Sequence, residues 1–268
     1  MKSGATRTLI MGILNATPDS FSDGGQFNQV EQALVHAKQM IADGADMIDV
    51  GGESTRPGAT PVDADEEIRR VIPVIGKLAR ELSIPISIDT YKAEVAKQAI
   101  EAGATIINDV WGAKRDPHMA KLAAETGVPI ILMHNRNETP YRNLMEDIIE
   151  DLRASIQIVE TAGVKAENIW LDPGIGFAKT YEENLAVMRN LHQIVALGYP
   201  VLLGTSRKSM IGQALDLPVS ERLEGTAATV AYGISQGCQI VRIHDVKEMA
   251  RVAKMMDAML QGTSLSID

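Results

Sequence analysis

Acidic, amide and histidine side chains end several short apolar runs of this sequence. Asp89 ends the run ISID, Asn108 lies at the end of TIIND, and Asp172 ends IWLD. Asn15 directly follows the run TLIMGIL, and His134 ends PIILMH. Buried polar groups cost free energy unless they are paired, so their repetition at the ends of apolar runs indicates a binding or catalytic site.

Basic side chains form a second group near the end of the chain. Arg207 and Lys208 follow the run PVLLG, and Arg242 and His244 lie in QIVRIHD. The chain as a whole is acidic, with 26 basic and 35 acidic residues and a net charge of −9. A local cationic group in such a chain indicates an anionic small-molecule ligand. The same acidity argues against a nucleic-acid partner, which usually needs a basic patch.

Eight apolar runs must position these side chains. They are short and rich in Ile, Leu and Val, which is typical of strands buried on both faces of a parallel sheet. The runs are 8–14, 47–50, 86–89, 105–109, 129–134, 169–172, 200–204 and 239–245. Between them, apolar residues spaced at i, i+3, i+4 and i+7 predict amphipathic helices. These stripes cover 30–41, 68–82, 95–100, 144–159, 185–195 and 246–256.

Strands that alternate with helices predict an α/β fold in which crossover helices join parallel strands. Eight such units in 268 residues predict a (β/α)8 TIM barrel, with residues 1–268 as a single domain. A doubly wound sheet is the alternative, and it is less favoured because no second domain is visible and eight units suit closure. Six helix-to-strand joints carry a glycine where a left-handed C-cap is favoured. These glycines are Gly44, Gly103, Gly127, Gly163, Gly198 and Gly237.

The barrel prediction places both groups of polar side chains at one rim. Active sites of such barrels lie at the carboxyl ends of the strands, and the loops after strands 7 and 8 frequently bind phosphate. Two long loops rich in Gly, Ser and Pro, 15–26 and 51–61, follow the first two strands, and their length favours a functional role. A single Asp at a strand end is often only a helix N-cap, and Asp109 and Asp245 fit that role best.

Cys238 is the one cysteine of the chain. It excludes an internal disulfide framework, favours a reducing, cytoplasmic location, and is expected to be a buried small hydrophobe. The first apolar run is too short to span a bilayer and lacks a cleavage site, so neither a membrane segment nor a signal peptide is expected. P-loop, dinucleotide-binding, zinc-ligand and nucleophile-elbow motifs are absent from the sequence.

Eight motifs lie along nearly the whole chain. They are MGILNATPDSFSDGG (11–25), IDVGGESTRPGA (48–59), SIDT (87–90), IINDVWG (106–112), LMH (132–134), LDPGIGFAK (171–179), LLGTSRKS (202–209) and RIHDV (242–246). Together they resemble the motifs of the dihydropteroate synthase family of pterin-binding barrels. The resemblance implies a transferase that joins 6-hydroxymethyl-7,8-dihydropterin diphosphate to p-aminobenzoate. The implied products are 7,8-dihydropteroate and diphosphate, on the path to folate, and sulfonamides are the implied inhibitors.

The resemblance also assigns roles to residues that match the family motifs. It implies pterin binding by Asp89, Asn108, Asp172, Lys208 and Arg242, among which Asp89, Lys208 and Arg242 are the catalytic candidates. The implied diphosphate site consists of Asn15, Arg242 and His244. Mg²⁺ is the implied cofactor, with Asn15 as its support from the protein, because this ion keeps phosphate oxygens and water among its ligands.

The implied p-aminobenzoate subsite combines residues of two loops with residues after the sixth and seventh strands. Its members are Phe21, Thr55, Arg56, Pro57, Phe177, Lys208 and Ser209. The family also implies a homodimer formed through outer helices. One stretch, 135–144, departs from the pattern that many members show after LMH, so its loop is expected to differ in shape.

Two other functions are compatible with parts of this pattern. A pterin-binding methyltransferase that passes a methyl group from a reduced folate to a corrinoid protein shares the fold and the Asp, Asn and Asp on strands 3, 4 and 6. That function does not need Lys208, the ESTRPGA motif of the second long loop, or a diphosphate site. A pterin- or anion-binding protein without catalysis is the third hypothesis, and it is disfavoured because the rim residues are intact.

Overall fold

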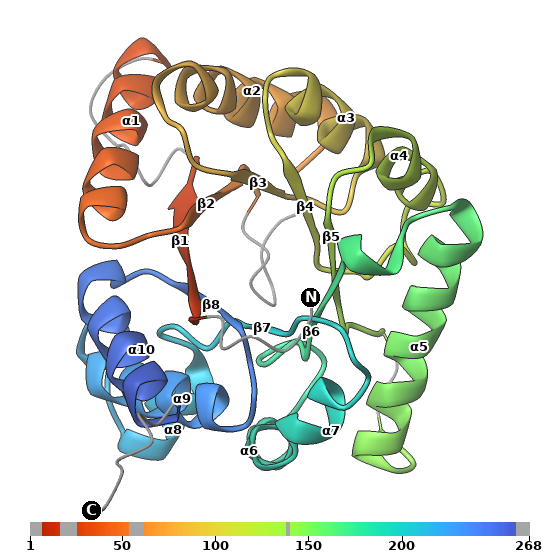
Figure 1. The fold of residues 1–268 in the computed structure, drawn as a ribbon, viewed down its shortest axis with the longest axis vertical. Helices are drawn as coiled ribbons and strands as arrows, with labels where there is room; N and C mark the ends of the chain where they lie inside the picture. The colour runs from red at the N-terminus through yellow and green to blue at the C-terminus, as the bar shows by residue number, and fades with distance from the viewer. Residues whose placement is uncertain (1–6, 17–25, 54–61, 138–139, 261–268) are drawn as a thin grey trace, which may run out of the picture.

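The computed structural model describes residues 7–16, 26–53, 62–137 and 140–260, and within them eight parallel strands form one barrel (Figure 1). The strands are β1 (Leu9–Asn15), β2 (Met47–Gly51), β3 (Ile86–Asp89), β4 (Ile106–Asp109), β5 (Ile130–Met133), β6 (Ile169–Asp172), β7 (Leu202–Leu203) and β8 (Ile240–Ile243). Their order is β6-β5-β4-β3-β2-β1-β8-β7, and a parallel bridge between Leu171 and Val201 joins the two ends of the sheet. The predicted (β/α)8 fold is therefore confirmed.

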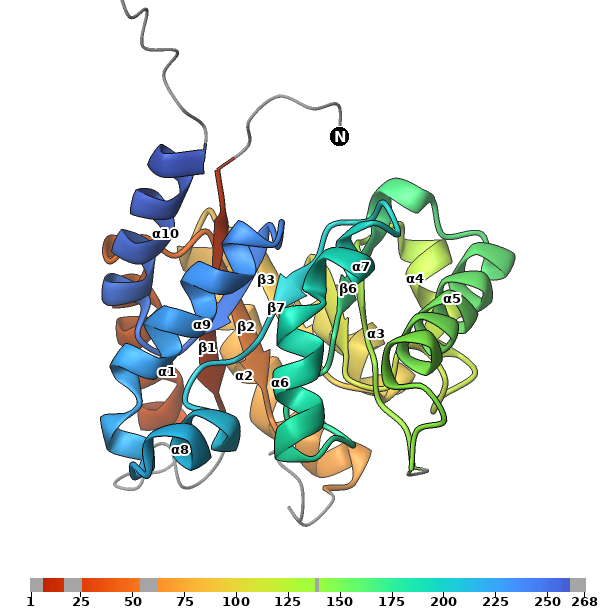
Figure 2. The same ribbon diagram turned by 90° about the horizontal axis from the view of Figure 1, so that it is seen from below.

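Helices surround the strands on the outside (Figure 1). They are α1 (Gln26–Ala42), α2 (Ala64–Glu81), α3 (Ala93–Glu101), α4 (Met119–Thr126), α5 (Leu144–Ala162), α6 (Tyr181–Arg189), α7 (Leu191–Val195), α8 (Ser209–Leu215), α9 (Leu223–Ser235) and α10 (Val246–Leu260), with short 3-10 turns at Ala166–Asn168 and Val219–Glu221. In Figure 2, α9 and α10 cover one side of the barrel and α4 and α5 the opposite side. Within the described ranges, no helix combines the length and apolarity that crossing a membrane requires.

Glycine ends the helices in the way that the sequence predicts. All six glycines of the helix-to-strand joints have a positive φ, from 69° at Gly127 to 117° at Gly103. An L-residue with a side chain pays a steric cost in this conformation, whereas glycine does not. The joints thus turn each helix sharply back into the next strand, and they keep the carboxyl ends of the strands on one rim.

Two apolar layers hold the barrel together. The larger one lies between the strands and the helices, and Cys238 belongs to it with 3% of its surface exposed, as predicted. The smaller one fills the barrel interior with Met11, Met47, Ile106, Ile131, Trp170, Leu202 and Ile240. It closes the interior toward the amino ends of the strands, so a ligand site must lie toward the carboxyl ends.

Candidate active site

A layer of polar side chains lies inside the barrel, next to the smaller apolar layer and on its side toward the carboxyl ends of the strands. Residues two apart on a strand point to the same face. Four residues of the apolar interior are therefore each followed, two positions later, by a polar residue that also faces the interior. These pairs are Met47 and Asp49, Ile106 and Asn108, Trp170 and Asp172, and Ile240 and Arg242. Asp89 joins this layer from β3, where it pairs in register with Asn108. The strand pattern thus switches from apolar to polar at one height, and a layer of charged and amide groups results.

Arg242 connects three strands of this layer. Its Nε donates to Oδ2 of Asp49 at 2.6 Å, and its Nη2 donates to Oδ2 of Asp89 at 2.7 Å. Asn108 Nδ2 donates to the same Asp49 oxygen at 3.1 Å. Oδ1 of Asp49 and Oδ1 of Asp89 are buried and have no hydrogen-bond partner in the described residues. Since native proteins pair nearly all buried polar atoms, these two acceptors are prepared for N–H donors of a ligand.

Burial sets the electrostatics of the same group. It raises the pKa of Asp89, and the Asp49 carboxylate raises it further, while the Arg242 guanidinium opposes the shift. Burial also works to lower the pKa of Arg242, but the two carboxylates outweigh it and raise this pKa above its usual range. Arg242 therefore stays charged and is the cation that allows two carboxylates to lie inside the barrel.

Asp172 and Lys208 meet Arg242 on the opposite side of the layer. A Cβ placed on Gly204, which follows β7, is 3.8 Å from Oδ2 of Asp172, 3.9 Å from Cβ of Arg242 and 4.0 Å from Nζ of Lys208. Burial lowers the pKa of the Lys208 ammonium to about 8, and Asp172 opposes this shift. Burial likewise raises the pKa of Asp172, and Lys208 opposes it. The predicted pterin-binding residues thus converge around Arg242.

The turn after β6 carries Phe177 next to Lys208. Lys208 Nζ lies 4.8 Å from the centre of the half-buried Phe177 ring, and it also donates to the carbonyl oxygen of Ile175. Oδ1 of Asp172 accepts from the Gly174 N–H at 2.7 Å. Ser209 follows Lys208 as the first, exposed residue of α8. One short turn therefore connects the candidate pterin residue Asp172 with the candidate p-aminobenzoate residues.

Two of the three candidate diphosphate residues, Asn15 and His244, lie farther out on the rim than Arg242, which belongs to the polar layer. Asn15 is exposed at the end of β1. His244 follows β8, and its Nδ1 lies 2.9 Å from Oγ of Ser206. Arg207 does not add to the cationic group, which is a correction to the sequence interpretation, because its Nε donates to Asp245 at 2.9 Å in a two-contact ion pair. Asp245 directly precedes α10, at the predicted N-cap position, but its carboxylate binds Arg207. Asp109 accepts from the backbone N–H groups of Trp111 and Ala113 in a turn, so the predicted helix N-cap at Asp109 is wrong.

Four of the predicted p-aminobenzoate residues lie outside the described residues. They are Phe21 in the first long loop and Thr55, Arg56 and Pro57 in the second. The described chain next to the second loop is firmly held. Lys92 donates to Glu53 and also, at 2.6 Å, to the buried Glu67, while Arg70 donates to the Gly52 carbonyl at 2.9 Å.

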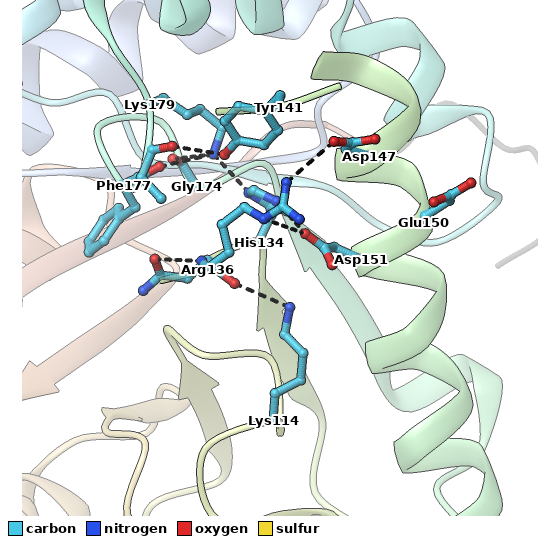
Figure 3. Close-up of polar contacts among 12 residues, drawn as sticks. Lys114, His134, Arg136, Tyr141, Asp147, Glu150, Asp151, Gly174, Phe177 and Lys179 are labelled. Atoms are coloured by element: carbon cyan, nitrogen blue, oxygen red, sulfur yellow. Dashed lines mark hydrogen bonds and ion pairs between the residues drawn. The ribbon is translucent and has the colours of Figure 1, made fainter. Parts of the chain in front are cut away.

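The predicted site residues omit two features that the structure shows. Asp49 is one, and its only signal is a single carboxylate in the run MIDV. The other is a polar group behind the turn after β6, drawn in Figure 3. There His134 lies between Asp151 of α5, at 3.1 Å, and Lys179, at 2.8 Å. His134 could be noticed in the sequence because it ends the apolar run PIILMH. Lys179 and Asp151 carry a charge, but nothing else in the sequence distinguishes them from other charged residues.

The residues present fit a magnesium ion only as a companion of a phosphate ligand. Across the described ranges, no three His, Cys, Asp or Glu side chains are grouped so that they could hold a metal ion. Asn15 instead offers one exposed amide oxygen at the rim. Mg²⁺ commonly takes one or two protein oxygens and completes its shell with phosphate oxygens and water, so a single amide is compatible with it.

Comparison with known proteins agrees with this geometry. The family described as "Pterin binding enzyme" matches residues 11–244. The chain is 64% identical over 254 residues to the dihydropteroate synthase of Bacillus subtilis. The aligned region covers 95% of this chain and 89% of that relative.

Two solved structures extend the comparison to the fold. A dihydropteroate synthase from Clostridium difficile, in the presence of pteroic acid, has a TM-score of 0.94 and 53% identity, covering 98% of this chain and 100% of that one. A Yersinia pestis dihydropteroate synthase in a sulfonamide drug complex has a TM-score of 0.90 and 41% identity, covering 97% and 96%. The chain therefore belongs to the pterin-binding enzyme family and, within it, to the dihydropteroate synthases.

Proposed function

We propose that this protein joins 6-hydroxymethyl-7,8-dihydropterin diphosphate to p-aminobenzoate and releases 7,8-dihydropteroate and diphosphate. The observation that carries the proposal is the pair of buried, unpartnered carboxylate oxygens on Asp49 and Asp89 beside Arg242. A pterin edge carries an amino group and ring N–H groups, which are donors for such oxygens. The family membership supplies the reaction in which a pterin of this kind takes part.

The reaction is a substitution at the exocyclic methylene carbon of the pterin. The bond from this carbon to the diphosphate oxygen breaks, and the electron pair leaves with diphosphate. The amine nitrogen of p-aminobenzoate then donates its lone pair to the carbon, and its proton passes to solvent or to the departing diphosphate. Positive charge develops on the pterin in between, and the carboxylate of Asp89 stabilises that charge electrostatically.

The cations and the apolar side chains have separate roles. Arg242 and His244 are the proposed contacts of the leaving diphosphate, and Lys208 donates to the pterin. Phe177 forms one side of the p-aminobenzoate subsite, and Ser209 at the start of α8 holds its carboxylate. The aromatic amine is neutral near pH 7, so positioning rather than proton abstraction supplies most of the remaining rate enhancement.

We further propose Mg²⁺ as the cofactor, with Asn15 as its protein ligand. When bound, the ion neutralises charge on the diphosphate. A homodimer formed through outer helices and a cytoplasmic location are also proposed, and the buried, unpaired Cys238 supports a reducing compartment. Light scattering of the purified protein tests the dimer, and cell fractionation tests the location.

A turnover assay tests the function directly. Purified protein is mixed with both substrates, and diphosphate release is followed with and without Mg²⁺. Sustained release over many turnovers should require p-aminobenzoate, fall on chelation with EDTA, and decrease with a sulfonamide that competes for the p-aminobenzoate subsite. Absence of diphosphate release, or methyl transfer from a reduced folate to a corrinoid protein instead, contradicts the proposal.

A further inference from the structure

The turn after β6 is held from behind by a half-buried lysine. Lys179 Nζ donates to the carbonyl oxygens of Gly174 at 3.0 Å and Phe177 at 3.1 Å, and it lies 2.8 Å from Nδ1 of His134. An ammonium group has three N–H donors. The three acceptors therefore satisfy it completely, and two of them belong to the turn itself. Figure 3 shows Lys179 on one side of this turn and the Phe177 ring directed away from it on the other.

His134 and Asp151 orient this lysine. Burial lowers the pKa of His134 to about 4, so the imidazole is neutral. A carboxylate can only accept, so Nε2–H donates to Asp151 at 3.1 Å, and Nδ1 of the neutral ring is the bare nitrogen that accepts from Lys179. A neutral histidine that donates to a carboxylate has one ring orientation and one tautomer. The acceptor for Lys179 is thus fixed by a residue on α5.

The turn also has little freedom to relax by other means. A Cβ on Gly174 would lie 2.0 Å from the His134 carbonyl oxygen, so the turn passes directly against the end of β5. Ala178 has a φ of 48°, in the left-handed region that a residue with a side chain rarely adopts, and its carbonyl accepts from the Tyr141 hydroxyl at 2.8 Å. Such strained backbone persists only where its surroundings over-determine it. Lys179 and Tyr141 provide that constraint from outside the barrel.

Lysines on the two sides of the turn have different roles. Lys208 donates to the Ile175 carbonyl from the side of the candidate substrates, whereas Lys179 holds the carbonyls of Gly174 and Phe177 from the opposite side. We propose that Lys179, oriented by His134 and Asp151, is a positioning residue that fixes the Phe177 side of the p-aminobenzoate subsite. The inference rests on the proposed function, since it concerns the second substrate of that reaction.

Steady-state kinetics of Lys179→Met tests the inference. The variant keeps the length of the side chain and removes the charge and its donors. Loss of charge-assisted hydrogen bonds predicts a KM for p-aminobenzoate that is at least about tenfold higher. The KM for the pterin diphosphate should rise less than that for p-aminobenzoate, because Asp89 and Asn108 lie on β3 and β4, and only Asp172 contacts the turn, through the Gly174 N–H. Lys121→Met, at an exposed lysine of α4, is the matched control and should leave both constants unchanged.

A second pair of variants decides the question if Lys179→Met does not fold. Asp151 is partly exposed, with 27% of its side chain accessible, so we expect its replacement to leave the fold intact. Asp151→Ala removes the acceptor of the His134 N–H and should raise the KM for p-aminobenzoate. Asp151→Asn keeps an oxygen that accepts this N–H and should restore the KM to within about twofold of the wild type.

The outcomes separate the inference from the proposed function. If the wild type releases no diphosphate, the proposed function fails. If the wild type is active and Lys179→Met has an unchanged KM for p-aminobenzoate, or equal rises for both substrates, the positioning role is wrong. With Lys179→Met unfolded, equal kinetics of Asp151→Ala and Asp151→Asn lead to the same conclusion.

Discussion

Arg242 on the last strand donates from Nη2 to Oδ2 of Asp89 on the third strand at 2.7 Å, although 153 residues separate them in the chain. The contact uses one carboxylate oxygen and leaves Oδ1 of Asp89 buried without a partner in the described residues. One side chain therefore pairs with Asp89 and leaves its second oxygen available as an acceptor. Asp49 repeats the arrangement from β2, with Oδ2 on Arg242 and Oδ1 unpartnered.

Asp89→Asn tests the electrostatic role of this carboxylate. The amide keeps the shape of the side chain but removes the negative charge that we propose stabilises the developing positive charge on the pterin. We expect kcat for diphosphate release to fall at least about 100-fold, as on loss of one preorganised electrostatic contact. The circular dichroism spectrum should not change. Asp216→Asn, at an exposed position after α8, is the control. Near-normal turnover of Asp89→Asn would falsify the role of Asp89.

Asp49→Asn tests the carboxylate that holds Arg242 and Asn108 together. Its Oδ2 accepts from both residues, so loss of the charge weakens two contacts of the pterin-binding layer. A hydrogen bond to a charged group contributes about 1.5–3 kcal/mol, which predicts roughly 10- to 100-fold weaker pterin binding. Isothermal titration of the pterin diphosphate measures the Kd. An unchanged Kd would mean that Asp49 only neutralises Arg242 and does not shape the site.

The polar residues at the strand ends can be predicted from the sequence, because a single physical rule places them. Parallel strands buried on both faces are apolar, so a polar residue that ends such a run must lie at the carboxyl rim, as Asp89, Asn108 and Asp172 do. Asp49 obeys the same inward alternation but stands within an apolar run, where its direction is visible only after the strand register is known.

Other features depend on geometry that the sequence does not express. Arg207 and Lys208 are adjacent and suggest a shared pocket, yet the φ of 57° at Arg207 is left-handed, and Arg207 pairs with Asp245 while Lys208 contacts Ile175. Lys179 and Asp151 meet His134 only because the turn after β6 and α5 lie on the two sides of this residue, which follows β5. The helix α9 has the sequence LEGTAATVAYGIS, whose small residues give no apolar stripe, so its periodicity did not predict a helix.

The buried His134 predicts a loss of stability in acid. Its pKa is lowered from 6.5 to about 4, chiefly by burial, whereas the unfolded chain keeps the ordinary value. Between these two values the unfolded state binds more protons, so stability falls as pH decreases from 6.5 toward 4. At pH 5 this group alone should cost about 2 kcal/mol relative to pH 7.5.

Urea unfolding of the wild type and of His134→Gln at both pH values isolates this contribution. Asp89 and Asp172 have raised pKa values and shift stability in the opposite direction, but they are present in both proteins and cancel in the comparison. The pH 5 loss should be about 2 kcal/mol larger in the wild type than in the variant. Equal losses in the two proteins contradict a neutral, buried imidazole.

Ala178→Gly tests the strain in the turn that carries Phe177. The φ of 48° at Ala178 costs an L-residue about 1–2 kcal/mol, which glycine does not pay, whereas glycine gives up about 0.5–1 kcal/mol in chain entropy. The net expectation is a gain of about 0.5–1 kcal/mol in the free energy of unfolding, measured by urea denaturation. Ala154→Gly, at an exposed position in the middle of α5, is the matched control and should lose about 1 kcal/mol. The two substitutions are chemically identical, so opposite signs are expected from backbone conformation alone, and a loss at both positions contradicts a strained turn.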